Sequence, residues 1–165
     1  MRLAKEWPAG PLVLGHDKEI AEFVRQRTPQ MDNTGFGQCT AIGVIRFRRL
    51  LGGVVYNNWH PEIGNIWVHF AFDDPRWATP SVLGSVCAYP FNQLGCKRVT
   101  AIVKRKNKRS REFIEKAIGF KLEGCIRKGF GNDDAMVYGL LRHECRWLEE
   151  NKKNGQVHTA TASAT

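Results

Sequence analysis

Apolar residues fill three successive strand-like segments of the chain, which are separated by turn-forming residues. The segments are 39–47, 50–59 and 65–72, and each is rich in β-branched and aromatic residues. Short apolar runs of this composition, bounded by turn residues, predict three β-strands. Gly52 and Gly53 and the stretch 60–64, which holds Pro61 and Gly64, supply turns or bulges between them. A shorter apolar stretch, 11–14, predicts an edge strand before the first helix.

Helical spacing follows in two places. Within 16–27, Ile20, Phe23 and Val24 form one apolar stripe, and Asp17 is a plausible cap for the helix start. A second helix is predicted over 80–94, because Thr79 can cap it and Pro80 suits the first helical position. Pro90 lies inside this segment and is expected to kink the helix.

The last third of the chain predicts a strand at 99–103, a helix capped by Asn107 and ended by Gly119, and two strands at 120–127 and 135–141. The summed order places helices on both sides of a mostly antiparallel sheet with a parallel pair at its centre. This is an α+β fold built as an α/β/α sandwich. We expect one domain over 1–150, and a disordered tail over 151–165 because that segment is polar and aperiodic.

Composition narrows the class of protein. Hydrophobic residues make up 42% and charged residues 25% of the 165 residues, as in soluble globular proteins. No apolar run approaches the ~18 residues of a membrane span, and the N-terminus lacks the pattern of a secretory signal. We therefore expect a cytoplasmic protein (the host cytoplasm if the gene is phage-encoded) with no membrane contact. The five cysteines and five histidines are scattered, so we expect no structural metal.

The net charge of +9 calls for an acidic partner. Nine Lys or Arg residues fall between Lys97 and Lys116, so the charge is concentrated. Two ligands fit, a nucleotide-bearing cofactor or nucleic acid, and an ordinary exposed helix face is the plainer alternative.

The junction between a strand and the helix that follows it is also a candidate anion-binding site. The strand ending at Phe72 and the helix starting at Pro80 place unpaired backbone N–H groups at the carboxyl end of the sheet, with Arg76 just before them. A diphosphate suits such a surface. Alternatively, Arg76 is a solvated loop cation.

The segment 99–142 resembles a known family. Asn107-x-x-Ser110, Ile118-Gly119-Phe120, Glu123-Gly124, Arg127 and Val137-Tyr138-Gly139 are similar to the C-terminal half of GCN5-related N-acetyltransferases (GNAT). The likeness is to the branch that acetylates protein N-termini, ribosomal proteins among them, and small amines. The stretches 89–98 and 141–147 resemble phage- and prophage-encoded members, and the whole match covers 12–148.

The resemblance implies acetyl-CoA as co-substrate, held between the splayed strands that end at Phe72 and Val103. The pantetheine arm is expected along Phe70, Ala71 and Phe72. The pyrophosphate is expected on the segment from 76 to 82, and the far side of the site at Asn107, Ser110 and Phe113. The implied phosphate-binding residues are therefore Arg76, Trp77, Ala78, Thr79, Pro80, Ser81 and Val82.

Two departures from the family pattern bear on this implication. The phosphate loop of the family usually reads Gln/Arg-x-x-Gly-x-Gly/Ala, and Arg76-Trp-Ala-Thr-Pro-Ser81 keeps the first position and neither glycine. The general-acid tyrosine of many relatives is replaced by Ile114, which leaves Ser110 as the nearest hydroxyl. Ser110 equally fits the first turn of the helix as an N3 residue. Base candidates are His69, Glu62 and His60, and His69 also fits a hydrogen-bonded, half-buried strand residue.

The leading interpretation is an N-acetyltransferase that transfers an acetyl group to a primary amine: a protein N-terminus, a lysine or a small amine. The catalytic candidates are Ser110 and His69. The alternatives are a catalytically degenerate nucleic-acid-binding module and an acetyltransferase acting on modified bases of phage DNA. The acceptor partner is a small molecule or peptide, nucleic acid is possible, and so is a homodimer.

Overall fold

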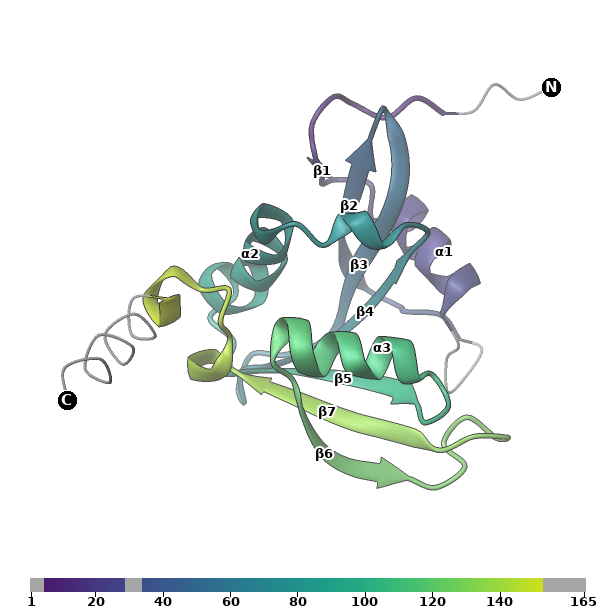
Figure 1. The fold of residues 1–165 in the computed structure, drawn as a ribbon, viewed down its shortest axis with the longest axis vertical. Coiled ribbons are helices and arrows are strands. Elements are labelled where there is room, and N and C mark those ends of the chain that lie inside the picture. The colour runs from purple at the N-terminus through teal and green to yellow at the C-terminus, as the bar shows by residue number, and fades with distance from the viewer. Residues whose placement is uncertain (1–4, 29–33, 153–165) are drawn as a thin grey trace, which may run out of the picture.

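The computed structural model describes residues 5–28 and 34–152. Within these residues, seven strands form one sheet in the order β1-β2-β3-β4-β5-β7-β6 (Figure 1). The strands are β1 Leu12–Val13, β2 Cys39–Arg46, β3 Arg49–His60, β4 Asn65–Phe72, β5 Arg98–Lys104, β6 Lys121–Ile126 and β7 Ala135–Leu141. All neighbours are antiparallel except β4 and β5. The expected α+β sandwich with a central parallel pair is confirmed.

Helices cover both faces of the sheet. Helix α1 (Asp17–Arg27) packs through Ile20 and Val24 onto β2, β3 and β4. Helices α2 (Pro80–Ala88) and α3 (Lys108–Phe113) lie on the opposite face, where they close the larger core cluster (Figure 1). No helix in the described residues is long and apolar enough to cross a membrane.

The start of α1 differs from the prediction. Asp17 is its first residue and makes no cap; the N-cap position is His16, which has no side-chain hydrogen bond there. The Asp17 carboxylate instead accepts a hydrogen bond from the backbone N–H of Ala41 at 2.7 Å. This contact ties the helix to β2, and a tertiary partner therefore takes the oxygen that local sequence assigned to the helix.

The second predicted helix is divided at Pro90. Helix α2 ends at Ala88, and Tyr89–Gln93 continues as one π-helical turn that ends before Gly95, which has φ +68°. Proline has no N–H to donate to the carbonyl four residues earlier, Val86. The buried Tyr56 hydroxyl donates to that carbonyl at 2.7 Å instead, and so satisfies the group that Pro90 leaves free.

Several capping predictions are confirmed. Thr79 Oγ1 accepts from Val82 N–H at the start of α2, and Asn107 Oδ1 accepts from Ser110 N–H at the start of α3. After α3, a π-turn over Ile114–Ile118 ends at Gly119, whose φ of +107° favours glycine. The short helices η1 (Pro75–Trp77) and η4 (Arg142–Glu144) complete the elements.

Contacts with the folded domain continue past residue 150, where the domain was predicted to end. The Asn151 side chain donates to the carbonyls of Arg142 and Cys145, both at 2.8 Å, and so anchors this segment to η4. The rest of the predicted tail, from 153 onward, lies outside the described residues.

Candidate functional site

Strands β4 and β5 pair at only three positions. Asn65, Ile66 and Trp67 face Arg98, Val99 and Thr100, and beyond Trp67 the two strands diverge. A parallel pair held at one end and open at the other leaves the inner edge of β4 without a ladder partner over residues 68–72. The predicted splay of the central pair is therefore present.

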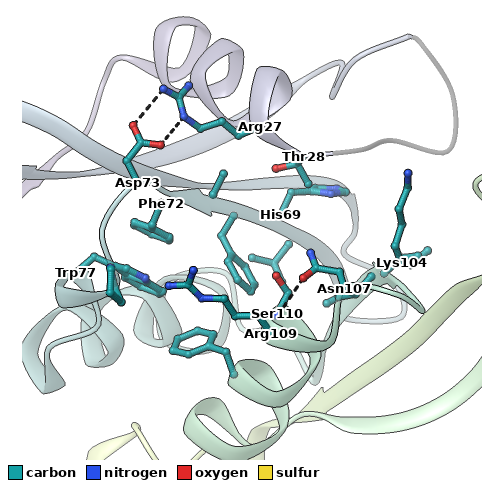
Figure 2. Close-up of a pocket in the computed structure, with 18 of the residues that line it drawn as sticks. Arg27, Thr28, His69, Phe72, Asp73, Trp77, Lys104, Asn107, Arg109 and Ser110 are labelled. Carbon is teal, nitrogen blue, oxygen red and sulfur yellow. Dashed lines mark hydrogen bonds and ion pairs between the residues drawn. The ribbon is translucent and has the colours of Figure 1, made fainter.

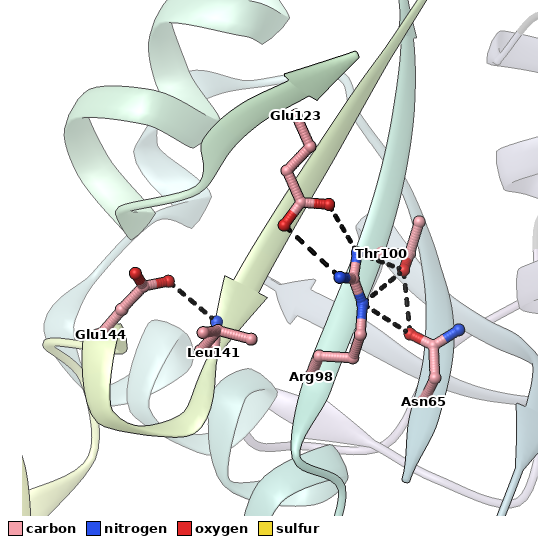
Figure 3. Close-up of polar contacts among 6 residues, drawn as sticks. All are labelled: Asn65, Arg98, Thr100, Glu123, Leu141 and Glu144. Carbon is pink, nitrogen blue, oxygen red and sulfur yellow. Dashed lines mark hydrogen bonds and ion pairs between the residues drawn. The ribbon is translucent and has the colours of Figure 1, made fainter. Parts of the chain in front are cut away.

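A buried polar cluster holds the closed end together (Figure 3). The Thr100 hydroxyl donates to Asn65 Oδ1 at 2.8 Å across the strand pair. Arg98 Nε donates to the same Asn65 oxygen at 3.2 Å, and its terminal nitrogen donates to Glu123 of β6 at 2.8 Å. Strands β4, β5 and β6 are thus tied at the point from which the cleft opens.

The open end is a cleft of about 340 Å³. Its walls are residues 68–73 of β4 and the loop after it, residues 101–104 of β5, and one side of α3, and it reaches α1 at Arg27 and Thr28. Figure 2 shows Phe72 and Trp77 at one side of the cleft, and Asn107 and Lys104 at the other side, where His69 also lies in this view.

Part of the predicted site comes together in this cleft. The pantetheine residues Phe70, Ala71 and Phe72 line it, as do the far-side residues Asn107, Ser110 and Phe113. Both catalytic candidates, His69 and Ser110, lie there, whereas His60 and Glu62 do not. Of the seven predicted phosphate-binding residues, Trp77 lines the cleft, and Arg76, Ala78, Thr79, Pro80, Ser81 and Val82 do not.

In the loop before α2, the backbone N–H groups of residues 76–79 are bonded within the loop itself. Arg76 N–H donates to Asp74 Oδ1 at 2.9 Å, and the Arg76 guanidinium binds the same carboxylate, which lowers the pKa of Asp74 to about 2. Other backbone N–H groups of the loop also donate to acceptors within it, and Pro80 has no N–H group. These bonds run from Trp77 to Asp74 O, from Ala78 to Pro75 O, from Thr79 to Trp77 O, and from Val82 to Thr79 Oγ1.

Trp77 forms the cleft wall on the side where the pyrophosphate was expected. Its indole stacks on Phe72 with ring centroids 3.5 Å apart and planes 2° from parallel, and Phe113 contacts it at 5.3 Å. Only 7% of the Trp77 surface is exposed. The side chain therefore separates the cleft from the start of α2.

The protonation of His69 is fixed by its neighbours. The Phe36 carbonyl can only accept, so the Asn57 amide nitrogen must face it, at 3.0 Å. Asn57 Oδ1 then faces His69 Nε2 at 2.9 Å, and this nitrogen must carry the hydrogen. Burial lowers the pKa of His69 to about 4. The ring is therefore neutral at pH 7, with its lone pair on Nδ1.

Other side chains of the site were not predicted. Arg27 donates to both carboxylate oxygens of Asp73, at 2.7 and 3.1 Å, on the α1 side of the cleft. Lys104 lies 5.6 Å from the Phe130 ring centre, and Arg109 of α3 lines the opposite wall. Arg109 belongs to the basic run noted in the sequence, but the run does not indicate which of its members faces the cleft.

Tyr138 and Ile114 do not act in this cleft. Tyr138 is fully buried and donates to Glu115 at 2.7 Å while accepting from Arg111 at 2.8 Å. Ile114, where the sequence resemblance implies a tyrosine, is also buried and does not line the cleft. Among the described residues that line the cleft, Ser110 and Thr28 carry the hydroxyl groups.

Solved structures that share this fold include acetyltransferases. The spermidine N-acetyltransferase of Vibrio cholerae, a dodecamer, matches with a TM-score of 0.58 and 15% identity over 69% of this chain and 70% of that chain. A protein assigned as an acetyltransferase from T. thermophilus matches with a TM-score of 0.59 and 17% identity, over 87% of this chain and 93% of that chain. A third protein, described as a probable acetyltransferase, matches with a TM-score of 0.54 and 22% identity over 65% of this chain.

The fold is that of the GNAT acetyltransferases. Within this GNAT fold the cleft lies between β4 and β5. At these identities the likeness shows the fold alone, and the chain spans 63% of the length of the last of the three proteins. No protein-family model and no curated protein matches the sequence.

Proposed function

We propose that this chain is an acetyl-CoA-dependent N-acetyltransferase that acts on a primary amine. The observation that carries the proposal is the cleft between β4 and β5, because it combines an unpaired strand edge with a neutral histidine and a helix capped by asparagine. The GNAT fold of the solved structures supports the same activity.

The residues of the cleft fit the pantetheine arm of acetyl-CoA, whereas the loop before α2 does not fit its pyrophosphate. The free edge of β4 over 68–72 can pair with the amide groups of a pantetheine arm, in the manner of an added strand. Asn107, Ser110 and Phe113 line the other wall. The loop from 76 to 79 does not fit a pyrophosphate, because its N–H groups are already bonded.

Bound acetyl-CoA would supply an acyl thioester at the carbon that the amine attacks. His69 Nδ1 can accept a hydrogen bond from the amine and orient its lone pair. With a pKa of about 4, His69 cannot hold the proton at pH 7, so we expect the proton to pass on to water. The Ser110 hydroxyl is the candidate donor to the departing sulfur.

The acceptor belongs to the same proposal. A protein N-terminus, a lysine side chain and a small amine each present a neutral nitrogen that His69 can orient once the ammonium form has lost a proton to water, and each is to be assayed. We also propose a homodimer, which light scattering tests, and a phage origin, which rests on the sequence resemblance.

The test is release of CoA thiol from acetyl-CoA in the presence of a panel of amines. The His69→Gln variant should lower kcat by about 10²-fold, while the KM for acetyl-CoA changes little. His60→Gln, which alters a histidine outside the cleft, is the matched control and should keep the wild-type kcat. An inactive wild type that also fails to bind acetyl-CoA would contradict the proposal.

A further inference from the structure

The wall of the cleft that α3 forms carries a cationic side chain. Three cations line the cleft, and two of them are engaged: Arg27 by the Asp73 carboxylate, and Lys104 by the Phe130 ring. Arg109 is exposed and, within the described residues, has no hydrogen-bond or ion-pair partner. Figure 2 shows its side chain reaching from α3 toward Trp77.

The chemistry of a guanidinium suits a diphosphate. Arginine presents five N–H donors in a planar fork, and it binds phosphate oxygens through two parallel hydrogen bonds. The single carboxylate in the cleft lining, Asp73, is held by Arg27, so no described lining residue competes with a phosphate for Arg109.

We propose that Arg109 forms the diphosphate-binding site of this chain, in place of the backbone of the loop before α2. The inference rests on the proposed function, since the diphosphate is that of a coenzyme A ester. The stacked rings of Trp77 and Phe72 close the loop side of the cleft, so the phosphates bind on the α3 side.

Calorimetric titration with CoA, with pantetheine and with ADP tests the assignment. Arg109→Gln should weaken CoA binding by about 10- to 100-fold, since hydrogen bonds to charged groups are lost. It should leave pantetheine binding unchanged, because pantetheine has no phosphate. Arg109→Lys should recover only part of the CoA affinity, because an ammonium lacks the fork.

Lys108→Gln is the matched control, because it removes the same charge from the neighbouring residue of α3, which does not line the cleft. Its CoA affinity should stay within about twofold of wild type. Equal CoA affinity in Arg109→Gln and wild type, or an equal loss in both variants, overturns the assignment.

The two proposals fail in different ways. If the wild type binds CoA and Arg109→Gln binds it equally well, the function stands and the Arg109 site is wrong. If the wild type binds ADP through Arg109 but binds no CoA, the anion site stands and the proposed function is wrong. If it binds neither, both are wrong. Unchanged melting temperatures of the three variants confirm that folding is not the cause.

Discussion

The Asn57 carboxamide controls the chemistry of His69. Its amide nitrogen is committed to the Phe36 carbonyl, so its oxygen faces the imidazole and selects the Nε2–H form. The Phe36 ring lies 4.7 Å from the imidazole and contributes to its burial. A strand histidine thereby becomes a neutral hydrogen-bond acceptor on the cleft wall, with no carboxylate partner of its own among the described residues.

Burial of His69 predicts a dependence of stability on pH. An unfolded histidine ionises near pH 6.5, whereas the pKa of His69 in the fold is about 4. Between these values the unfolded chain binds a proton that the folded chain does not. The free energy of unfolding should therefore be fully retained above pH 6.5 and fall by up to about 3 kcal/mol as the pH drops to 4.

Urea unfolding at successive pH values measures this effect. His69→Gln should flatten the curve between pH 6.5 and 4 relative to wild type, and His60→Gln, with an exposed ring, should not. A wild-type slope that persists in His69→Gln would assign the effect to other groups.

The element that opens the cleft is the parallel pair of β4 and β5. Its last paired position, Trp67 with Thr100, lies beside the buried contact between Thr100 and Asn65. The polar cluster is stabilising there because the Thr100 hydroxyl and the Asn65 carboxamide are buried and need hydrogen-bond partners. The cluster keeps one end of the pair closed while the other end diverges.

Thr100→Val tests the closed end. Valine keeps the shape but removes the donor to Asn65, so the free energy of unfolding should fall by about 1–2 kcal/mol. Glu123→Gln removes the half-exposed ion pair with Arg98 and should change it by less than about 1 kcal/mol. Chemical denaturation of both variants is the measurement, and an effect of Glu123→Gln larger than that of Thr100→Val would place the stabilisation outside the strand pair.

At the scale of the whole molecule, the sequence predicts the features that depend on residues close together along the chain, such as helix starts and ends. Thr79, Asn107 and Gly119 delimit helices through their own backbone geometry, and the order of elements follows from such signals. The cap at Asp17 failed because its partner, Ala41, is distant in sequence. The side chain of Arg109 faces the cleft because of how α3 packs on the sheet, and the sequence alone does not supply that packing.

The net charge of +9 fits either a polyanionic cofactor or nucleic acid, and the two ligands respond differently to salt. Acetyl-CoA in a walled cleft should raise the free energy of unfolding by ~2.7 kcal/mol at 100 times its Kd. Duplex DNA held by exposed lysines should lose affinity with a log–log slope of about −0.9 per phosphate contacted. Thermal unfolding with millimolar acetyl-CoA, at low and at physiological salt, separates them. Because the cleft is walled by apolar rings and an unpaired strand edge, we expect the cofactor shift to persist at physiological salt; its absence at both salt concentrations would favour the nucleic-acid alternative.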